Sequence, residues 1–226
     1  IAANLTTPDT ARALVWVFDA TNLGASLGGT PLTIVPLFTD TPRALAVNAA
    51  GDTVYAAGFQ TGNQTTAVSE GVVCDGGSGA PPCTVFGSNY PGGLPAPNVD
   101  ANSVLGPETG LIVKFNGANW VDRLNRNWNN AVKFTLPDTD VFAINANANP
   151  PVQITSFAHV GTVLFNMAVN PISGRVYVTN SEANNAVRFE GPGSGGSTVR
   201  GHLAEMRVTV LDGANVNPRH LNKHIN

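Results

Sequence analysis

The sequence predicts an all-β fold built from a repeated unit of short strands. Hydrophobic residues make up 42% of the 226 residues, which is enough for a packed core. Glycine and proline contribute 24 and 16 residues, and they fall between short apolar runs, as expected for turns that join strands. No segment has a sustained helical period, and at most one helical turn is expected, near residues 125–132.

Internal repeats are the third observation, and they define the unit. The stretch Ala46–Tyr55 recurs as Ala168–Tyr177: each has a strand that ends in Asn, a Gly-containing turn, and a second strand that starts with Val-Tyr. This turn chemistry is typical of a β-hairpin. The stretch Asn129–Phe134 recurs as Asn184–Phe189, with Val and Phe on the same face of a strand.

In a third repeat, Val15–Asp19 recurs as Val208–Asp212. Each segment is expected to be a strand that ends at an Asp suited to an Asx turn. The repeated unit is therefore a group of about four short strands, like a blade of a β-propeller. In the first copy we expect strands near Leu14–Asp19, Leu32–Phe38, Ala44–Asn48 and Thr53–Gly58. In the later copy we expect them near Val141–Asn145, Val152–Phe157, Phe165–Asn170 and Arg175–Thr179.

One hairpin carries a family resemblance. The segment Met167–Gly174, followed by Arg175 and Tyr177-Val178-Thr179-Asn180, resembles the YVTN family of β-propeller repeats, which is named for those last four residues. The first copy departs from the motif, because it reads Tyr55-Ala56-Ala57-Gly58. The resemblance implies a propeller from a bacterial or archaeal surface, periplasmic or secreted protein. Propellers of this kind also occur beside c-type cytochrome domains or in lactonase-like enzymes.

The predicted organisation is a single β-propeller region over residues 1–226, with a loop excursion at Gln60–Pro107 that is rich in Gly, Pro, Ser and Asn. We count about four units, including partial ones, where closed propellers have four to eight blades. Val208–Asp212 is expected to open a further unit. Because an open end leaves an unpaired edge strand, we expect a partial propeller completed by the rest of a longer polypeptide, a partner chain or a terminal cap.

Charge limits the classes of partner. Charged residues make up only 12% and the net charge is −3, against about 25% charged residues in a typical domain. No basic stripe is present, so nucleic-acid binding is not expected. No run approaches the roughly 18 apolar residues of a membrane-spanning helix. A surface of neutral polar groups favours a periplasmic or extracellular location.

The two cysteines, Cys74 and Cys83, flank a Gly- and Pro-rich loop. A local disulfide is the favoured interpretation, and two free thiols are the alternative. No second Cys/His pair with ligand spacing lies nearby to suggest zinc.

Polar and aromatic candidates for binding are few. Arg200, His202 and Glu205 form the best charged cluster, beside a glycine-rich loop. Trp120 and Trp128 flank an Asn- and Arg-rich loop, where they either bind carbohydrate or a protein partner or cap the core. Trp16 lies within an apolar strand and is expected in the core.

Metal and catalytic signals are weak. His220 and His224 would share one face of a helix, but they lie in what reads as a loop without a third ligand. The carboxylates at turn positions are expected to cap those turns; they are Asp19, Asp52, Asp138, Asp140 and Asp212. No nucleophile elbow, Walker A loop or zincin motif is present, and no catalytic residue is assigned.

The function predicted from these observations is an extracytoplasmic β-propeller that acts as a protein-interaction, scaffold or ligand-binding module. The alternative is the propeller part of an enzyme or redox complex, either a lactonase-like hydrolase or the partner of a c-type cytochrome. The sequence has no Cys-x-x-Cys-His for haem attachment, and the cofactor, if any, stays open.

Overall fold

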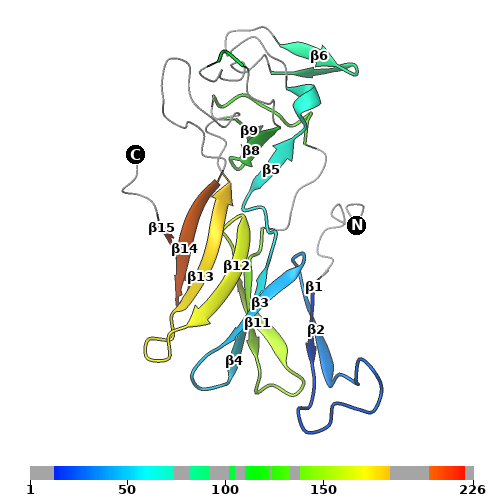
Figure 1. Cartoon of the computed structure of the whole chain (residues 1–226), viewed down its shortest axis with the longest axis vertical. Helices are drawn as coiled ribbons and strands as arrows, with labels where there is room; N and C mark the ends of the chain where they lie inside the picture. The colour runs from blue at the N-terminus through cyan, green and yellow to red at the C-terminus, as the bar shows by residue number, and fades with distance from the viewer. Residues whose placement is uncertain are drawn as a thin grey trace. The chain divides into compact units, whose positions relative to one another are not determined.

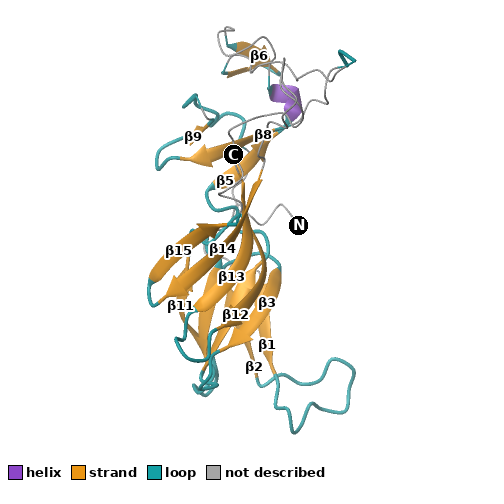
Figure 2. Cartoon of the chain, turned by 60° about the vertical axis from the view of Figure 1, so that its left-hand side comes forward, coloured by secondary structure: helices purple, strands orange, loops and turns teal. Residues whose placement is uncertain are grey.

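A computed structural model describes residues 13–73, 82–91, 102–104, 110–122, 124–132, 138–183 and 204–221. It divides into two compact units. Unit 1 comprises Ile1–Asn63, Leu136–Glu182 and Met206–Asn226, and unit 2 comprises Gln64–Thr135 and Ala183–Glu205. Figure 2 shows strands in both units, and the helical structure among the described residues is the 3-10 turn η2 (Glu70–Val72).

Unit 1 consists of antiparallel sheets in chain order (Figure 1). Sheet A is the hairpin of β1 (Ala13–Val17) and β2 (Thr33–Leu37). Sheet B has the order β11-β10-β4-β3, formed by β3 (Pro42–Val47), β4 (Thr53–Gly58), β10 (Val141–Asn145) and β11 (Val152–Phe157). Sheet C has the order β12-β13-β14-β15, formed by β12 (Val163–Val169), β13 (Val176–Ala183), β14 (Ala204–Asp212) and β15 (Asn215–His220).

The turns of the two repeat hairpins have the predicted chemistry. In the β3–β4 turn, Gly51 has φ +75° and donates its N–H to the Asn48 carbonyl. In the β12–β13 turn, Gly174 has φ +71° and donates to the Asn170 carbonyl. Glycine suits both places because a positive φ strains residues that have a Cβ. The Asn side chains accept further backbone N–H groups inside each turn, which fixes the register of both hairpins.

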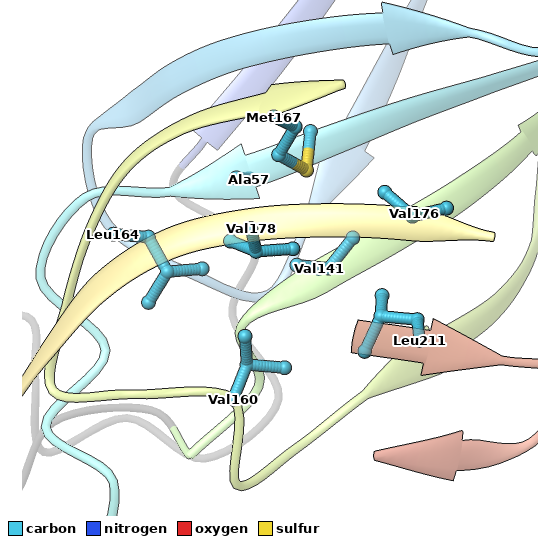
Figure 3. Close-up of a cluster of buried hydrophobic side chains, with 8 residues drawn as sticks. All are labelled: Ala57, Val141, Val160, Leu164, Met167, Val176, Val178 and Leu211. Carbon is cyan, nitrogen blue, oxygen red and sulfur yellow. The ribbon is translucent and has the colours of Figure 1, made fainter. Parts of the chain in front are cut away.

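Sheet B is the middle layer of the unit, and its two central strands, β4 and β10, are covered on both faces. One face packs on sheet C through a cluster that is drawn in Figure 3 and comprises Ala57, Val141, Val160, Leu164, Met167, Val176, Val178 and Leu211. The opposite face packs on sheet A through Ala13, Val35, Leu37, Ala56, Phe142 and Ile144. This explains why β10 is an apolar run without alternation, since successive side chains of a strand point to opposite faces.

The strands predicted for the two copies of the unit are present, but their grouping into repeat units was wrong. The strand predicted at Asn129–Phe134 was also wrong, because residues 129–132 form a turn and irregular structure. Its repeat at Asn184–Phe189 lies outside the described residues. The sequence placed the strands of Leu14–Gly58 in one unit, whereas β1–β2 forms its own sheet and β3–β4 joins β10–β11. Val208–Asp212 was expected to open a new unit, and instead it lies in β14, the third strand of sheet C. Periodicity marks where strands lie, and it carries no information on which strands pair. The fold is all-β with several small antiparallel sheets, and the described residues form no closed propeller.

Both sheets B and C are interrupted at the same place. The second strand of sheet B, β4, connects to the third strand, β10, through the long segment that includes Gln64–Thr135 of unit 2. The second strand of sheet C, β13, connects to β14 through residues 184–203, which also belong to unit 2. Each four-stranded sheet is therefore a pair of hairpins with an insertion between them.

Unit 2 has a small core of its own. It contains a sheet of β5 (Thr65–Val68), β8 (Leu111–Phe115) and β9 (Trp120–Val121), and a hairpin of β6 (Cys83–Val85) and β7 (Ser88–Tyr90). Its core comprises Val68, Val73, Tyr90, Leu111, Val113, Trp128 and Ala131. The predicted excursion at residues 60–107 lies mostly in this unit.

Candidate functional site

The insertions leave and re-enter unit 1 at one end of its sheets. Gln60, just after β4, forms an antiparallel bridge with Val163 at the start of β12. Val163 in turn lies opposite Ser181 near the end of β13. The ends of β4 and β13 and the start of β12 therefore meet, and most of the buried polar side chains of unit 1 gather there.

A chain of polar contacts, which we call the polar relay, crosses this end. It consists of Arg207, Glu182, Asn63, His159 and Asp138. Asn63 Nδ2 donates to Glu182 Oε2 at 2.6 Å, and Arg207 Nη1 lies 3.7 Å from the same oxygen. His159 Nδ1 lies 3.2 Å from Asn63 Oδ1 and 3.8 Å from Asp138 Oδ2.

Within the polar relay, the carboxylate of Glu182 is buried and the imidazole of His159 is exposed to solvent. The Glu182 side chain is 5% exposed and that of His159 is 59% exposed. Asn63 and His159 have φ values of +45° and +61°, a region that residues with a Cβ rarely adopt and that occurs most often at turns and functional sites. Arg207 and Asn63 compensate the buried charge of Glu182, so the relay clamps the chain where it leaves unit 1.

Asp140, just before β10, is a buried carboxylate next to the relay. It is 0% exposed, and its Oδ2 accepts the N–H of Val160 at 2.6 Å. Burial raises its pKa to about 6. The hydroxyl of Thr61 and the N–H of Val160 lower the pKa, and the nearby charge of Asp138 raises it. Asp140 thus caps a distant segment and not its own turn, so local turn capping was the wrong interpretation for this residue.

Further buried side chains bond to the carbonyl groups of Val160 and Gly161. Asn180 Nδ2 donates to Thr209 Oγ1 at 2.9 Å, and Thr209 Oγ1 donates to the Val160 carbonyl at 2.8 Å. Thr61 Oγ1 donates to the Gly161 carbonyl at 2.8 Å. Val160 and Gly161 are therefore fixed by side chains from β13, from β14 and from the segment after β4.

The predicted charged cluster is only partly described. Glu205 lies near the start of β14 and is half-buried, whereas Arg200 and His202 lie outside the described residues. The cluster of these residues therefore stays a prediction.

Of the two histidines predicted as weak metal ligands, one lies among the described residues. His220 lies in β15, opposite Arg207 of β14. The segment Asn217–His220 is thus a strand, and reading it as a loop was wrong. His224 lies outside the described residues. Across the described ranges, no three His, Cys, Asp or Glu side chains lie close enough together to hold a metal ion.

The aromatic candidates have separate roles. Trp128 is 0% exposed, stacks on Tyr90 and donates from Nε1 to Asp122 Oδ2 at 3.0 Å, so it caps the core of unit 2. Trp120 is half-buried and lies against Phe115, with ring centroids 5.5 Å apart. Trp16, expected in the core, is instead 51% exposed on β1.

One cysteine of the predicted Cys74–Cys83 disulfide lies at the start of the β6–β7 hairpin. Cys83 is the first residue of β6 and is disulfide-bonded. Cys74 lies outside the described residues, so its pairing with Cys83 stays a prediction.

The turn between β6 and β7 carries an exposed aromatic residue that was not predicted as a binding candidate. Val85 pairs with Ser88, and the turn between them consists of Phe86 (φ +50°) and Gly87 (φ +78°). Phe86 is 98% exposed. A turn with positive φ at both central residues favours Asn-Gly, and a bulky residue at the first place is strained. The Phe-Gly pair between two short strand-like runs was the available signal.

No family model matches the chain, and searches of curated proteins and of solved structures found no match either. The YVTN-type repeat therefore stays a prediction from the residues. Among the described residues, no helix is long and apolar enough to cross a membrane.

Proposed function

We propose that this chain is a protein-interaction module of the β-propeller type that acts outside the cytoplasm. Phe86, at the tip of the β6–β7 hairpin, is the apolar anchor for the partner. The observation that carries the proposal is the combination of full exposure and positive φ at a bulky aromatic residue. Neither packing nor turn propensity favours Phe86 at this place, while exposed aromatic side chains often contribute much of an interface's binding energy.

The arrangement of unit 1 supports the propeller part of the proposal. Sheets A, B and C follow one another in the chain and pack face to face in that order. Sheets B and C are meanders of four strands, as propeller blades are. Binding residues of many proteins lie on loops that a rigid framework positions, and here the insertions follow the second strand of both meanders.

The location outside the cytoplasm is supported by two properties of the chain. Charged residues are scarce, at 12%, and Cys83 is disulfide-bonded. Disulfides persist in oxidising compartments and are rare in the cytosol.

Replacing Phe86 with asparagine is expected to stabilise the hairpin while removing the anchor. Asn-Gly is the preferred pair for such a turn, so F86N should raise the free energy of unfolding of unit 2 by about 1 kcal/mol. Urea denaturation measures this change. A loss of stability in F86N would show that Phe86 is held in place by packing, and it would contradict the role proposed here.

The partner itself is tested by photo-crosslinking in the native extracytoplasmic fraction. A photoreactive phenylalanine replaces Phe86 in one variant and Ile172 in the other; Ile172 is 97% exposed in the β12–β13 turn of unit 1. We expect one dominant protein adduct from position 86, suppressed by excess unlabelled wild-type chain and retained with excess F86N. Equal adducts from both positions, or equal competition by F86N, would overturn the proposal.

The alternative function makes a different prediction. If the chain is the propeller part of a redox complex with a c-type cytochrome, the complex isolated through the position 86 adduct will show a Soret band. An adduct that absorbs only as protein supports the interaction module and speaks against the redox alternative.

A further inference from the structure

Sheet A has half the strands of sheets B and C. In sheet B, β10 pairs with β11 on one side and β4 on the other. In sheet C, β14 lies between β13 and β15. Among the described residues, β1 pairs with β2 alone, which leaves one edge of β1 open.

Sequence and pairing show that β1 takes the place of β10 and β14. Val15–Asp19 matches Val208–Asp212 of β14 and also Val141–Asn145 of β10, which ends at Asn in place of Asp. Each of the three strands is followed by a hairpin partner, namely β2, β15 or β11. Sheet A therefore corresponds to the second hairpin of sheets B and C.

The backbone of β1 has the same orientation as that of β10. The N–H of Ala146, just after β10, donates to the carbonyl of Asp52, just before β4, so the backbone groups of even-numbered residues in β10 face β4. The Val17 carbonyl accepts the N–H of Leu32, so the backbone groups of odd-numbered residues in β1 face β2. The backbone groups of Leu14 and Trp16 consequently face the open edge of β1. Leu14 corresponds to Asp140, and Trp16 corresponds to Phe142 of β10.

The outer face of sheet A is apolar in the way that the buried faces of sheet B are. Trp16 is 51% exposed, whereas Phe142, which takes the same place in β10, is 1% exposed because sheet A covers it. Leu14 and Ile34 on the same outer face are 44% and 39% exposed. The strand residues on this face are uncharged, and exposed apolar patches of this kind mark interaction surfaces.

We propose that the open edge of β1 accepts a β-hairpin with the pattern of Pro42–Gly58, supplied by a partner polypeptide. In sheets B and C, the strand beside the third strand is the second strand of such a hairpin, which begins with Val-Tyr at Val54 or Val176. Residues 1–12 do not contain this Asn-Gly-Val-Tyr pattern. The added strand would bond to the backbone groups of Leu14 and Trp16 and extend sheet A, as in β-strand addition.

This inference rests on the stacked sheets of the proposed function and not on Phe86, so the two proposals can fail separately. The test uses the full chain and a synthetic peptide of residues 42–58, with a scrambled peptide as control. Hydrogen exchange of the β1 amides is the readout. We expect the peptide to slow exchange at Leu14 and Trp16 by about tenfold or more and to leave Val15, which already faces β2, unchanged.

Two variants make the test specific. W16K puts a charge on the outer face and should weaken peptide binding by about tenfold or more, while the matched change I172K, at an exposed turn residue of sheet C, should leave it unchanged. Native exchange at Val35 and Phe142 checks that W16K is folded. Equal slowing by the scrambled peptide, no slowing with the 42–58 peptide at millimolar concentration, or protection of Leu14 and Trp16 in the free chain would overturn the proposal.

Discussion

Replacing Gly161 with alanine is expected to lower the free energy of unfolding of unit 1 by about 3 kcal/mol, the size of a severe overpacking change. A Cβ at position 161 would lie 2.5 Å from Asn180 Oδ1 and 2.8 Å from Asn180 Cβ. Asn180 is 0% exposed, so it has no free space to move into. Its displacement breaks the hydrogen bond to Thr209 and leaves buried polar groups without partners.

Urea denaturation of G161A measures this loss. Gly71 is the matched control, because the nearest atom to a Cβ there is Ser69 Oγ at 3.9 Å and its φ is not positive. G71A should change stability by less than about 0.5 kcal/mol. If G161A unfolds at the same urea concentration as G71A, the buried network around Val160 and Gly161 does not constrain unit 1.

Replacing Asp140 with asparagine is expected to change how stability depends on pH. Burial raises the pKa of Asp140 from 3.8 to about 6, so the folded state favours the protonated carboxyl. The stability that this group contributes is fully present below pH 3.8 and is lost as the pH rises towards 6 and beyond. A shift of this size corresponds to about 3 kcal/mol.

D140N removes the titration and keeps an oxygen that accepts the N–H of Val160. The wild type should therefore lose about 3 kcal/mol relative to D140N between pH 3.5 and pH 8, measured by urea denaturation across that range. Asp52 is the control, because hydrogen bonds from Asn48 and Thr53 lower its pKa. The contribution of Asp52 is lost as the pH falls, so D52N should show the opposite sign. Parallel curves for wild type and D140N would contradict burial of the charge.

Local structure was predictable from the sequence because strands and tight turns depend on nearby residues. The Asn48 and Asn170 turns form as predicted, with Gly51 and Gly174 at positive φ. The Asx turn at Asp19 also forms, since its Oδ1 accepts the N–H of Thr21 at 2.8 Å. These contacts join residues close together in the chain, and the residue types alone specify them.

Pairing between strands was not predictable, because it joins segments that are distant in the sequence. The insertion between β4 and β10 separates neighbours of one sheet, so the repeat was divided at the wrong hairpin. Trp16 was assigned to the core because its strand is apolar on both faces. The pattern could not show that the sheet which covers Phe142 has no described counterpart over Trp16.

The polar relay could not be predicted either, because its contacts also join residues that are distant in the sequence. Asn63, His159 and Glu182 carry no motif, and they meet only because three strand ends converge. Asp140 was read as a turn cap, since nothing in the local sequence indicates its contact with Val160. Phe86 lies in a recognisable turn, but its significance depends on an exposure that only the structure gives.

In unit 1, sheets B and C are equivalent, because in each of them an insertion separates two hairpins; in sheet B this makes β4 pair with β10. A cysteine pair at Tyr55 and Ala143 tests it directly, because these residues lie opposite each other in the two strands and adjacent strands bring such pairs within disulfide reach. The control pair at Tyr55 and Ile144 is offset by one residue, which puts the side chains on opposite faces.

The Tyr55→Cys/Ala143→Cys variant is expected to form a disulfide during air oxidation, seen by mass spectrometry as the loss of the two thiol hydrogens in a peptide that joins the two strands. The Tyr55→Cys/Ile144→Cys variant should stay reduced at these positions. If the first pair stays reduced while the protein is folded, or if both pairs form equally, then β4 and β10 do not pair in this register, and the equivalence of sheets B and C is wrong.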